Sequence, residues 1–246
     1  MRHLDIVPVL KDNYVYLLPL PDRQAIAVDP GEAHAVQEHL NAEGRVLHSI
    51  LITHHHADHT GGNAALKARY GCKIIGPDDG RIPGLDQVVG GGDSFAVGPY
   101  AIRVIATPGH TTGHVCYYLP NEGVLFSGDT LFLGGCGRLF EGTAETMWRS
   151  LQLLMELPDA TLVYAGHEYT ESNLRFAASI ETANAAIQER LRRVKGRCSM
   201  PGNLGEEKRT NPFLRAVDPD FQEQIGMKGA DPVEVFARLR SMKDDF

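Results

Sequence analysis

Four potential metal ligands lie within six consecutive residues of the sequence, namely His54, His56, Asp58 and His59. The apolar run before them is typical of a buried strand, and the glycine pair after them opens a helical pattern, so the cluster is predicted on a strand-to-helix loop. Alternation along an extended chain points His54 and His56 to the same side, whereas Asp58 and His59 lie where the chain turns. Imidazole and carboxylate groups are suitable ligands for zinc, iron or manganese. We therefore interpret the cluster as a metal site; the other interpretation is a histidine-rich surface loop.

Three further residues of ligand type follow apolar strand patterns elsewhere in the chain. His110 comes after the run 100–106, Asp129 after 124–127 and His167 after 162–164. Each of the three directly follows a glycine, which allows a tight turn of the backbone. Loops at strand ends are where α/β folds commonly assemble their sites. The recurrence favours the metal interpretation over a chance cluster of histidines.

Seven ligands are more than one ion needs, and we expect them to hold two. The first ion would be held by His54, His56 and His110, the second by Asp58, His59 and His167, with Asp129 as the bridge. Two neighbouring ions can share a water molecule and lower its pKa enough to supply hydroxide near neutral pH. The pattern therefore predicts a hydrolase.

The elements around these ligands alternate between strands and helices as far as about Glu168. Strands are predicted over 15–18, 25–28, 47–52, 73–75, 100–106, 115–119, 124–127 and 162–164, and helices over 32–42, 61–70 and 143–156. Beyond Glu168 the chain is largely helical over 172–195, and a last helix is expected to begin near Asp231-Pro232. The pattern indicates an α/β fold of layered sheets covered by helices. We place a catalytic domain over 1–168 and a helical domain over 169–246.

The composition narrows the class of partner. The 246 residues carry a formal net charge of −7, which argues against a partner held mainly by phosphate contacts, so no nucleic acid is expected. No apolar run approaches the roughly 20 residues of a membrane span, and the N-terminus lacks the apolar stretch of a secretory signal. We therefore expect a cytoplasmic protein without a membrane partner. The four cysteines include no Cys-x-x-Cys pair, which favours reduced thiols.

The ligands and several later motifs resemble the metallo-β-lactamase superfamily and, more narrowly, the hydroxyacylglutathione hydrolase (glyoxalase II) family. The His-x-His-x-Asp-His signature is specific only for the superfamily, and the later motifs narrow the likeness, which covers essentially the whole chain. The motifs that carry it occupy residues 53–62, 107–114, 128–132, 135–143, 166–170, 211–213 and 240–246.

The resemblance implies an αββα sandwich followed by a helical domain that helps to bind substrate. It implies hydrolysis of S-D-lactoylglutathione to D-lactate and glutathione, the second step of methylglyoxal detoxification. The metal ligands of the family fall on the seven positions named above. Its cofactor is two divalent ions, which we expect to be zinc, with iron or manganese as alternatives. The residues that hold glutathione in the family fall on Arg138, Tyr169, Arg240 and Lys243. We expect a monomer.

The glutathione positions agree with the chemistry of an anionic substrate. Guanidinium groups bind carboxylates bidentately, and Arg240 and Lys243 lie about one turn apart on a predicted helix. From their spacing alone, Arg240 and Lys243 would be interpreted as part of a solvated helix face. One position departs from the family, which often has tyrosine where this chain has Phe140. We therefore expect the protein to bind glutathione thioesters more weakly and to retain the hydrolytic chemistry.

We expect a metal-bridging hydroxide to attack the thioester carbonyl, with Asp58 and Asp129 as the catalytic carboxylates. Asp58 would orient the hydroxide and accept its proton, and glutathione thiolate would leave without a strong general acid. The main alternative is a glutathione persulfide dioxygenase with a single iron on the same fold. A β-lactamase, an RNA-processing nuclease and a non-enzymatic metal-binding module are weaker alternatives.

Overall fold

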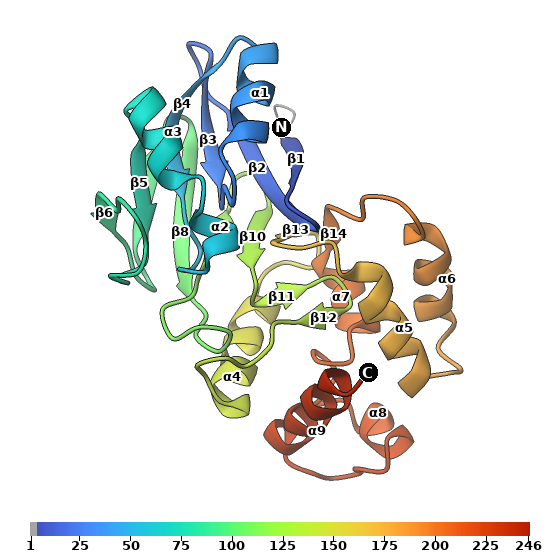
Figure 1. Ribbon diagram of the computed structural model, residues 1–246. Helices are drawn as coiled ribbons and strands as arrows, with labels where there is room; N and C mark the ends of the chain where they lie inside the picture. The colour runs from blue at the N-terminus through green and yellow to red at the C-terminus, as the bar shows by residue number, and fades with distance from the viewer. Residues whose placement is uncertain (1–3) are drawn as a thin grey trace. The chain divides into compact units, whose positions relative to one another are not determined.

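The computed structural model describes residues 4–246, which are shown in Figure 1. The chain divides into two compact units. The first unit consists of the chain up to Ala106 together with Gly113–Gly128, and the second of Thr107–Thr112 together with Asp129–Phe246. The chain therefore leaves the first unit after β8 (Tyr100–Ala106), returns to it for a strand pair, and then leaves it again.

The first sheet of the first unit has its strands in chain order. They are β1 (Asp5–Val9), β2 (Asn13–Pro19), β3 (Gln24–Val28), β4 (Val46–Leu51), β5 (Lys73–Gly76) and β6 (Gln87–Val88). The strands from β1 to β3 pair antiparallel, and those from β3 to β6 pair parallel. Parallel neighbours need a crossover connection, and α1 (His34–Ala42) and α3 (Asn63–Tyr70) lie in two of these connections (Figure 1).

A second set of strands in the same unit is antiparallel throughout. It consists of β7 (Ser94–Val97), β8 (Tyr100–Ala106), β9 (Val115–Leu119) and β10 (Val124–Gly128). Side-chain alternation along β2 separates the two faces of the first sheet: Val15 and Leu17 pack in a core with α1 and α3, whereas the ring of Tyr16 lies 5.5 Å from Phe126 of β10. The hydroxyl of Tyr117 on β9 donates to the carbonyl oxygen of Ile52 over 2.8 Å. The two sheets therefore pack face to face, with α1 and α3 on the outer face of the first.

The second unit is mostly helical. Its helices are α4 (Ala144–Met155), α5 (Thr170–Ile180), α6 (Ala185–Val194), α7 (Leu204–Thr210), α8 (Pro219–Gln224) and α9 (Pro232–Asp244). Its strands are short: β11 (Leu131–Phe132) pairs with β12 (Gly135–Cys136), and β13 (Leu162–Ala165) pairs with β14 (Gly202–Asn203). Aromatic contacts join the helices, because the ring of Phe236 on α9 lies 5.7 Å from Phe213 and 6.3 Å from Trp148 on α4.

The predicted elements are confirmed apart from their ends. The region 172–195, predicted as largely helical, contains two helices, because α5 ends at Ile180 and α6 begins only at Ala185. Glu181 is buried and pairs with Arg215, far along the chain, and Asn184 starts a new helix by accepting hydrogen bonds from the backbone N–H of Ala186 and Ile187. A short helix, α2 (Ala57–Thr60), lies within the histidine cluster itself. The predicted last helix is confirmed, with Asp231 as its cap and Pro232 at its first position.

Two further expectations concern the whole described chain. Within residues 4–246, no helix combines the length and the apolar character that a membrane span requires. The four cysteines are free, as predicted: Cys72, Cys116 and Cys136 are buried and Cys198 is exposed.

Candidate metal centre

The first unit brings the four side chains of the histidine cluster together. Nε2 of His54 lies 3.1 Å from Nδ1 of His56, on the segment that follows β4. The ring centroid of His59 lies 4.2 Å from that of His54, and Nε2 of His59 lies 3.6 Å from Oδ2 of Asp58. The last two residues belong to α2, whose first turn directs them back towards the preceding histidines. Imidazole nitrogens this close to one another are the usual arrangement of ligands around a cation.

Asp29, directly after β3, supports this cluster from behind. Its two carboxylate oxygens accept hydrogen bonds from the backbone N–H and the hydroxyl of Thr53, over 2.8 and 2.7 Å. Nδ1 of His59 lies 3.1 Å from the same carboxylate. The buried acid therefore favours the tautomer of His59 with its proton on Nδ1, which leaves the lone pair on Nε2 for a metal ion.

Asp29 has a second possible role, because ligand atoms of Asp29, His54 and His59 all lie within 4.8 Å of one another. We place Asp29 behind the ligands, since both of its oxygens are engaged by Thr53 and one of them also by His59. Asp29 is not among the residues predicted from the sequence. The signal was present, because Asp29 follows an apolar strand in the same way as the other acidic and histidine candidates.

Asp58 is oriented by Asn13, at the start of β2. The Asn13 amide donates to Oδ2 of Asp58 over 2.9 Å and to its backbone carbonyl over 3.3 Å. The backbone of this turn is also tightly packed, because a Cβ added to Gly31 would lie 1.9 Å from the carbonyl oxygen of Asp58. Only glycine allows this approach. Asn13 thus holds the carboxylate of Asp58, and the close approach of Gly31 packs against its backbone.

Two other histidines of the first unit lie beside the cluster in different roles. Nδ1 of His55 lies 3.2 Å from Oδ2 of Asp79. Hydrogen bonds from Arg81 hold the pKa of Asp79 at about 2, so that this carboxylate is charged at neutral pH. His114 is buried, and its ring stacks on that of His54 with the centroids 4.9 Å apart. These contacts place His55 beside a carboxylate and give His114 a packing position.

The second unit brings His110, Asp129 and His167 together. Nε2 of His110 and Nε2 of His167 each lie 3.4 Å from Oδ2 of Asp129. Nδ1 of His110 lies 2.9 Å from the carbonyl oxygen of Arg138 and donates to it, which again leaves Nε2 as the metal-binding atom. One carboxylate thus lies between two imidazole nitrogens, which is the arrangement expected of a carboxylate shared by two ions.

Backbone packing holds Asp129 and His110 in place. A Cβ added to Gly137 would lie 2.0 Å from the carbonyl oxygen of Asp129 and 3.1 Å from Nδ1 of His110. Gly137 therefore permits the segment that carries Arg138 to approach both residues.

Three basic side chains of the second unit gather around Asp244. Arg240 of α9 is buried; it donates to the carbonyl oxygen of Cys136 and to Oδ1 of Asp244, each over 2.9 Å. Nε of Arg138 lies 3.5 Å from the same oxygen, and the Lys243 ammonium donates to the hydroxyl of Ser172 over 3.2 Å. Within the described chain, the buried Nε of Arg240 has no hydrogen-bond partner. One carboxylate thus lies among three cations. The excess of positive charge is available to an anionic ligand.

Two exposed aromatic rings lie beside the histidines of the second unit. Tyr169 stacks on His167, with the ring centroids 4.7 Å apart and an interplanar angle of 5°. The ring of Phe140, which is 63% exposed, lies 5.2 Å from that of His110. Both rings are partly exposed, Tyr169 to 37%, and so present a surface to a bound molecule.

The residues present fit a metal site. Each unit presents imidazole and carboxylate donors, the set suited to zinc, iron or manganese. His59 and His110 each have one ring nitrogen directed to an oxygen behind the site, and Asn13 holds a carboxylate. Such supporting partners orient ligands before an ion binds.

The sequence matches two family models, which together span most of the chain. A model of the metallo-β-lactamase superfamily matches residues 11–167. A model described as the hydroxyacylglutathione hydrolase C-terminus matches residues 168–246.

Curated relatives of the chain are similar over nearly their full length. A hydroxyacylglutathione hydrolase from Methylococcus capsulatus is 50% identical over 248 residues, covering 98% of this chain and 97% of the relative. A protein with the same name from Rhodospirillum rubrum is 51% identical over 256 residues, covering 100% of both chains.

Solved structures of lower identity share the fold. ETHE1 from Myxococcus xanthus aligns with a TM-score of 0.72 at 29% identity, covering 97% of this chain and 90% of that one. The BLEG-1 B3 metallo-β-lactamase aligns with a TM-score of 0.68 at 26% identity, covering 86% of this chain and 99% of that one. TTHA1623, solved in a di-iron-bound form, aligns with a TM-score of 0.63 at 25% identity, covering 85% and 98%.

Proposed function

The chain belongs to the hydroxyacylglutathione hydrolase family, within the metallo-β-lactamase superfamily, and from this premise we propose that it hydrolyses S-D-lactoylglutathione to D-lactate and glutathione. The observation that carries the proposal is the match of residues 168–246 to the C-terminal model of that family. This region contains Tyr169, Arg240 and Lys243, three of the four residues expected to hold glutathione. A metallo-β-lactamase fold alone supports many hydrolytic activities, and this region narrows the substrate to a glutathione thioester.

The metal site of the proposal consists of the seven residues named from the sequence. They are His54, His56, Asp58, His59, His110, Asp129 and His167. We propose that they hold two divalent ions, zinc first, with iron and manganese compatible with the same donors. Bound at this site, two ions supply a water of lowered pKa and a Lewis acid for the carbonyl oxygen of the thioester.

The chain's own carboxylates have distinct roles in the proposal. Asp58 accepts the proton of the attacking water, because Asn13 fixes its carboxylate and leaves it no choice of orientation. Asp129 lies between His110 and His167 and keeps their imidazole groups in place. Departure of the glutathione sulfur needs no strong acid, since a thiol has a far lower pKa than an alcohol and leaves as the thiolate.

Glutathione recognition is assigned to Arg138, Tyr169, Arg240 and Lys243. Glutathione carries two carboxylates, and the three cations around Asp244 provide charge that this one acid does not neutralise. Guanidinium groups bind carboxylates in pairs, which suits Arg138 and Arg240 to this ligand. The exposed face of Tyr169 provides an apolar surface for the peptide backbone beside His167.

The proposal also covers the domain organisation, the oligomeric state and the location of the protein. A catalytic domain ends near Glu168 and a helical substrate-binding domain follows. The protein acts as a monomer. It is cytoplasmic, because glutathione is the main thiol buffer of that compartment and the four cysteines are unpaired.

The test compares two thioesters of D-lactate, one with glutathione and one with N-acetylcysteamine, which lacks the two carboxylates. The expected result is a much lower KM for the glutathione thioester, and a loss of that difference in Arg138→Gln, whose side chain is exposed and remote from the core. Equal kcat/KM for the two thioesters in the parent protein would contradict the substrate assignment while leaving the hydrolase class intact.

A further inference from the structure

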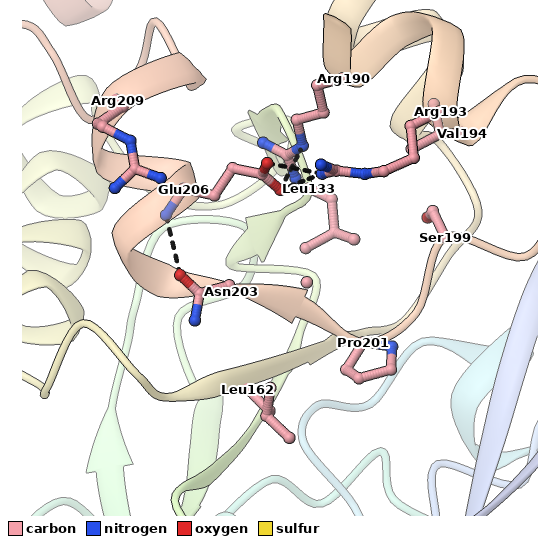
Figure 2. A pocket seen from close by; sticks show the side chains of 11 residues that line it. Leu133, Leu162, Arg190, Arg193, Val194, Ser199, Pro201, Asn203, Glu206 and Arg209 are labelled. Atoms are coloured by element: carbon pink, nitrogen blue, oxygen red, sulfur yellow. Dashed lines mark hydrogen bonds and ion pairs between the residues drawn. The ribbon is translucent and has the colours of Figure 1, made fainter. Parts of the chain in front are cut away.

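A pocket of about 430 Å³ lies within the second unit, apart from the residues assigned to the metal and to glutathione (Figure 2). It is formed by the end of α6, the strand pair β13–β14 and the first turns of α7. Its apolar lining comes from Leu133, Leu162, Val194 and Pro201. Its polar lining is dominated by three arginines and one acid, namely Arg190, Arg193, Arg209 and Glu206.

The arginines of the pocket outnumber its acids. Figure 2 shows the guanidinium groups of Arg190 and Arg193 converging on the carboxylate of Glu206. Nε of Arg190 lies 3.2 Å from one oxygen of Glu206, and Nη2 of Arg193 lies 2.6 Å from both oxygens. Arg190 is neutralised further by Glu207, whose carboxylate is buried beside it. Glu206 is therefore shared by two cations.

Arg209 adds further positive charge, and the acid that it faces, Asp159, is also paired with Lys208. Across residues 4–246, the Arg209 guanidinium forms no ion pair. Three more exposed basic residues lie on the same segment as Arg193, namely Arg192, Lys195 and Arg197. This basic surface occurs in a chain whose formal net charge is −7. Local charge of the opposite sign to the whole molecule attracts small anions to the pocket.

The walls of the pocket are held in place without a ligand. The backbone N–H and hydroxyl of Ser199 donate to the carboxylate of Glu168 over 2.8 and 2.7 Å, which fixes the loop before β14. Asn203 caps α7 by accepting from the backbone N–H of Glu206. A pocket formed before binding costs little ordering entropy when a ligand enters.

We propose that this pocket is a binding site for a small organic anion that joins an oxyanion head to an apolar body. The head, a carboxylate, phosphate or sulfonate, pairs with Arg193 and Arg209, because planar guanidinium groups bind such oxygens in pairs. The apolar body lies on Leu133, Leu162 and Val194. The inference does not depend on the proposed thioesterase activity.

The test uses 8-anilinonaphthalene-1-sulfonate, which has a sulfonate head and an aromatic body and whose fluorescence rises on binding. The parent protein is titrated beside the double variant Arg193→Gln/Arg209→Gln and the control Arg192→Gln, a neighbouring exposed arginine that does not line the pocket. The expected result is a dissociation constant about tenfold or more weaker in the double variant and unchanged in the control. Melting temperatures measured on the same samples establish that all variants are folded. If the double variant does not fold, Arg209→Gln alone replaces it, because Arg209 holds no other element.

Two results would overturn the proposal. One is equal affinity of the probe for the parent and for the pocket variants. The other is displacement of the probe by glutathione at saturating concentration, because this would place the probe in the substrate site. Persistence of the probe in the presence of glutathione, together with the loss in the double variant, supports a separate anion site.

Discussion

His59 and Asp29 form a buried contact in which Nδ1 of the imidazole lies 3.1 Å from Oδ2 of the carboxylate. The same carboxylate accepts two hydrogen bonds from Thr53, the residue before the first histidine of the cluster. A residue outside the proposed ligand set thus fixes both the start of the cluster and the tautomer of its last member.

Asp29→Asn is expected to weaken metal binding by about 10- to 100-fold, the usual effect of removing a partner behind a ligand. Asparagine keeps the shape of the side chain and tolerates the left-handed backbone at this position, where φ is +51°. It loses the charge that stabilises the Nδ1 proton of His59. The measurement is the metal dissociation constant by competition with a chelator, with Asp78→Asn, an exposed acid of the same unit, as the control. An unchanged dissociation constant would limit Asp29 to a role in stability.

Replacing Asp58 by alanine is expected to lower kcat by about 100-fold or more at saturating metal, since general-base contributions fall in this range or above it. Asp129→Ala is expected to have an effect of at least the same size. Asn13→Ala, which removes the amide that holds the Asp58 carboxylate, should cost less than either. Steady-state hydrolysis of S-D-lactoylglutathione measures all three. Full activity of the Asp58 or Asp129 variant would remove that carboxylate from the mechanism.

Lys243 gives the substrate affinity a pH dependence. Burial, together with the neighbouring cations Arg240 and Arg138, lowers the pKa of Lys243 below its ordinary value of 10.5. The charged form is therefore lost at a lower pH than in a free lysine, and KM should rise as the pH approaches 10.5 from below. Arginine stays charged over this range, so Lys243→Arg should shift the rise in KM to higher pH. The same KM profile in parent and variant would show that the substrate amine, and not Lys243, titrates.

Phe140→Tyr is expected to lower the KM for the glutathione thioester by about 2- to 10-fold, the value of one added hydrogen bond, with kcat unchanged. The ring is 63% exposed, so the added hydroxyl meets no buried group. The N-acetylcysteamine thioester of D-lactate serves as the control substrate, because it lacks the peptide that the hydroxyl would contact. A decrease of equal size for both thioesters would refute a specific contact with glutathione.

Local sequence patterns predicted the elements that position the candidate site. Each apolar run followed by glycine and a ligand-type residue is a strand end. The predicted fold class is a metallo-β-lactamase α/β fold followed by a helical C-terminal region. It is confirmed by the family models and by the structural likeness to ETHE1. These features depend on residues close in sequence, where side-chain periodicity and turn chemistry are informative.

What the sequence did not predict depends on pairs that are distant in the chain. Asp29 was not predicted as part of the site, because its contact with His59 spans 30 residues. The break between α5 and α6 follows from the buried pair of Glu181 with Arg215, which is 34 residues away. Arg240 could pass for a solvated residue of a terminal helix, yet it is only 6% exposed and donates to Cys136, 104 residues earlier. Spacing along one element carries no information on such partners.

The most direct test of the central claim is hydrolysis of S-D-lactoylglutathione by protein whose metal content is counted on the same sample. We expect turnover with about two ions per chain, lost on chelation and restored when the metal is returned. Protein that carries two ions and leaves the thioester intact would contradict it. A single iron per chain without thioester hydrolysis would favour the persulfide dioxygenase instead.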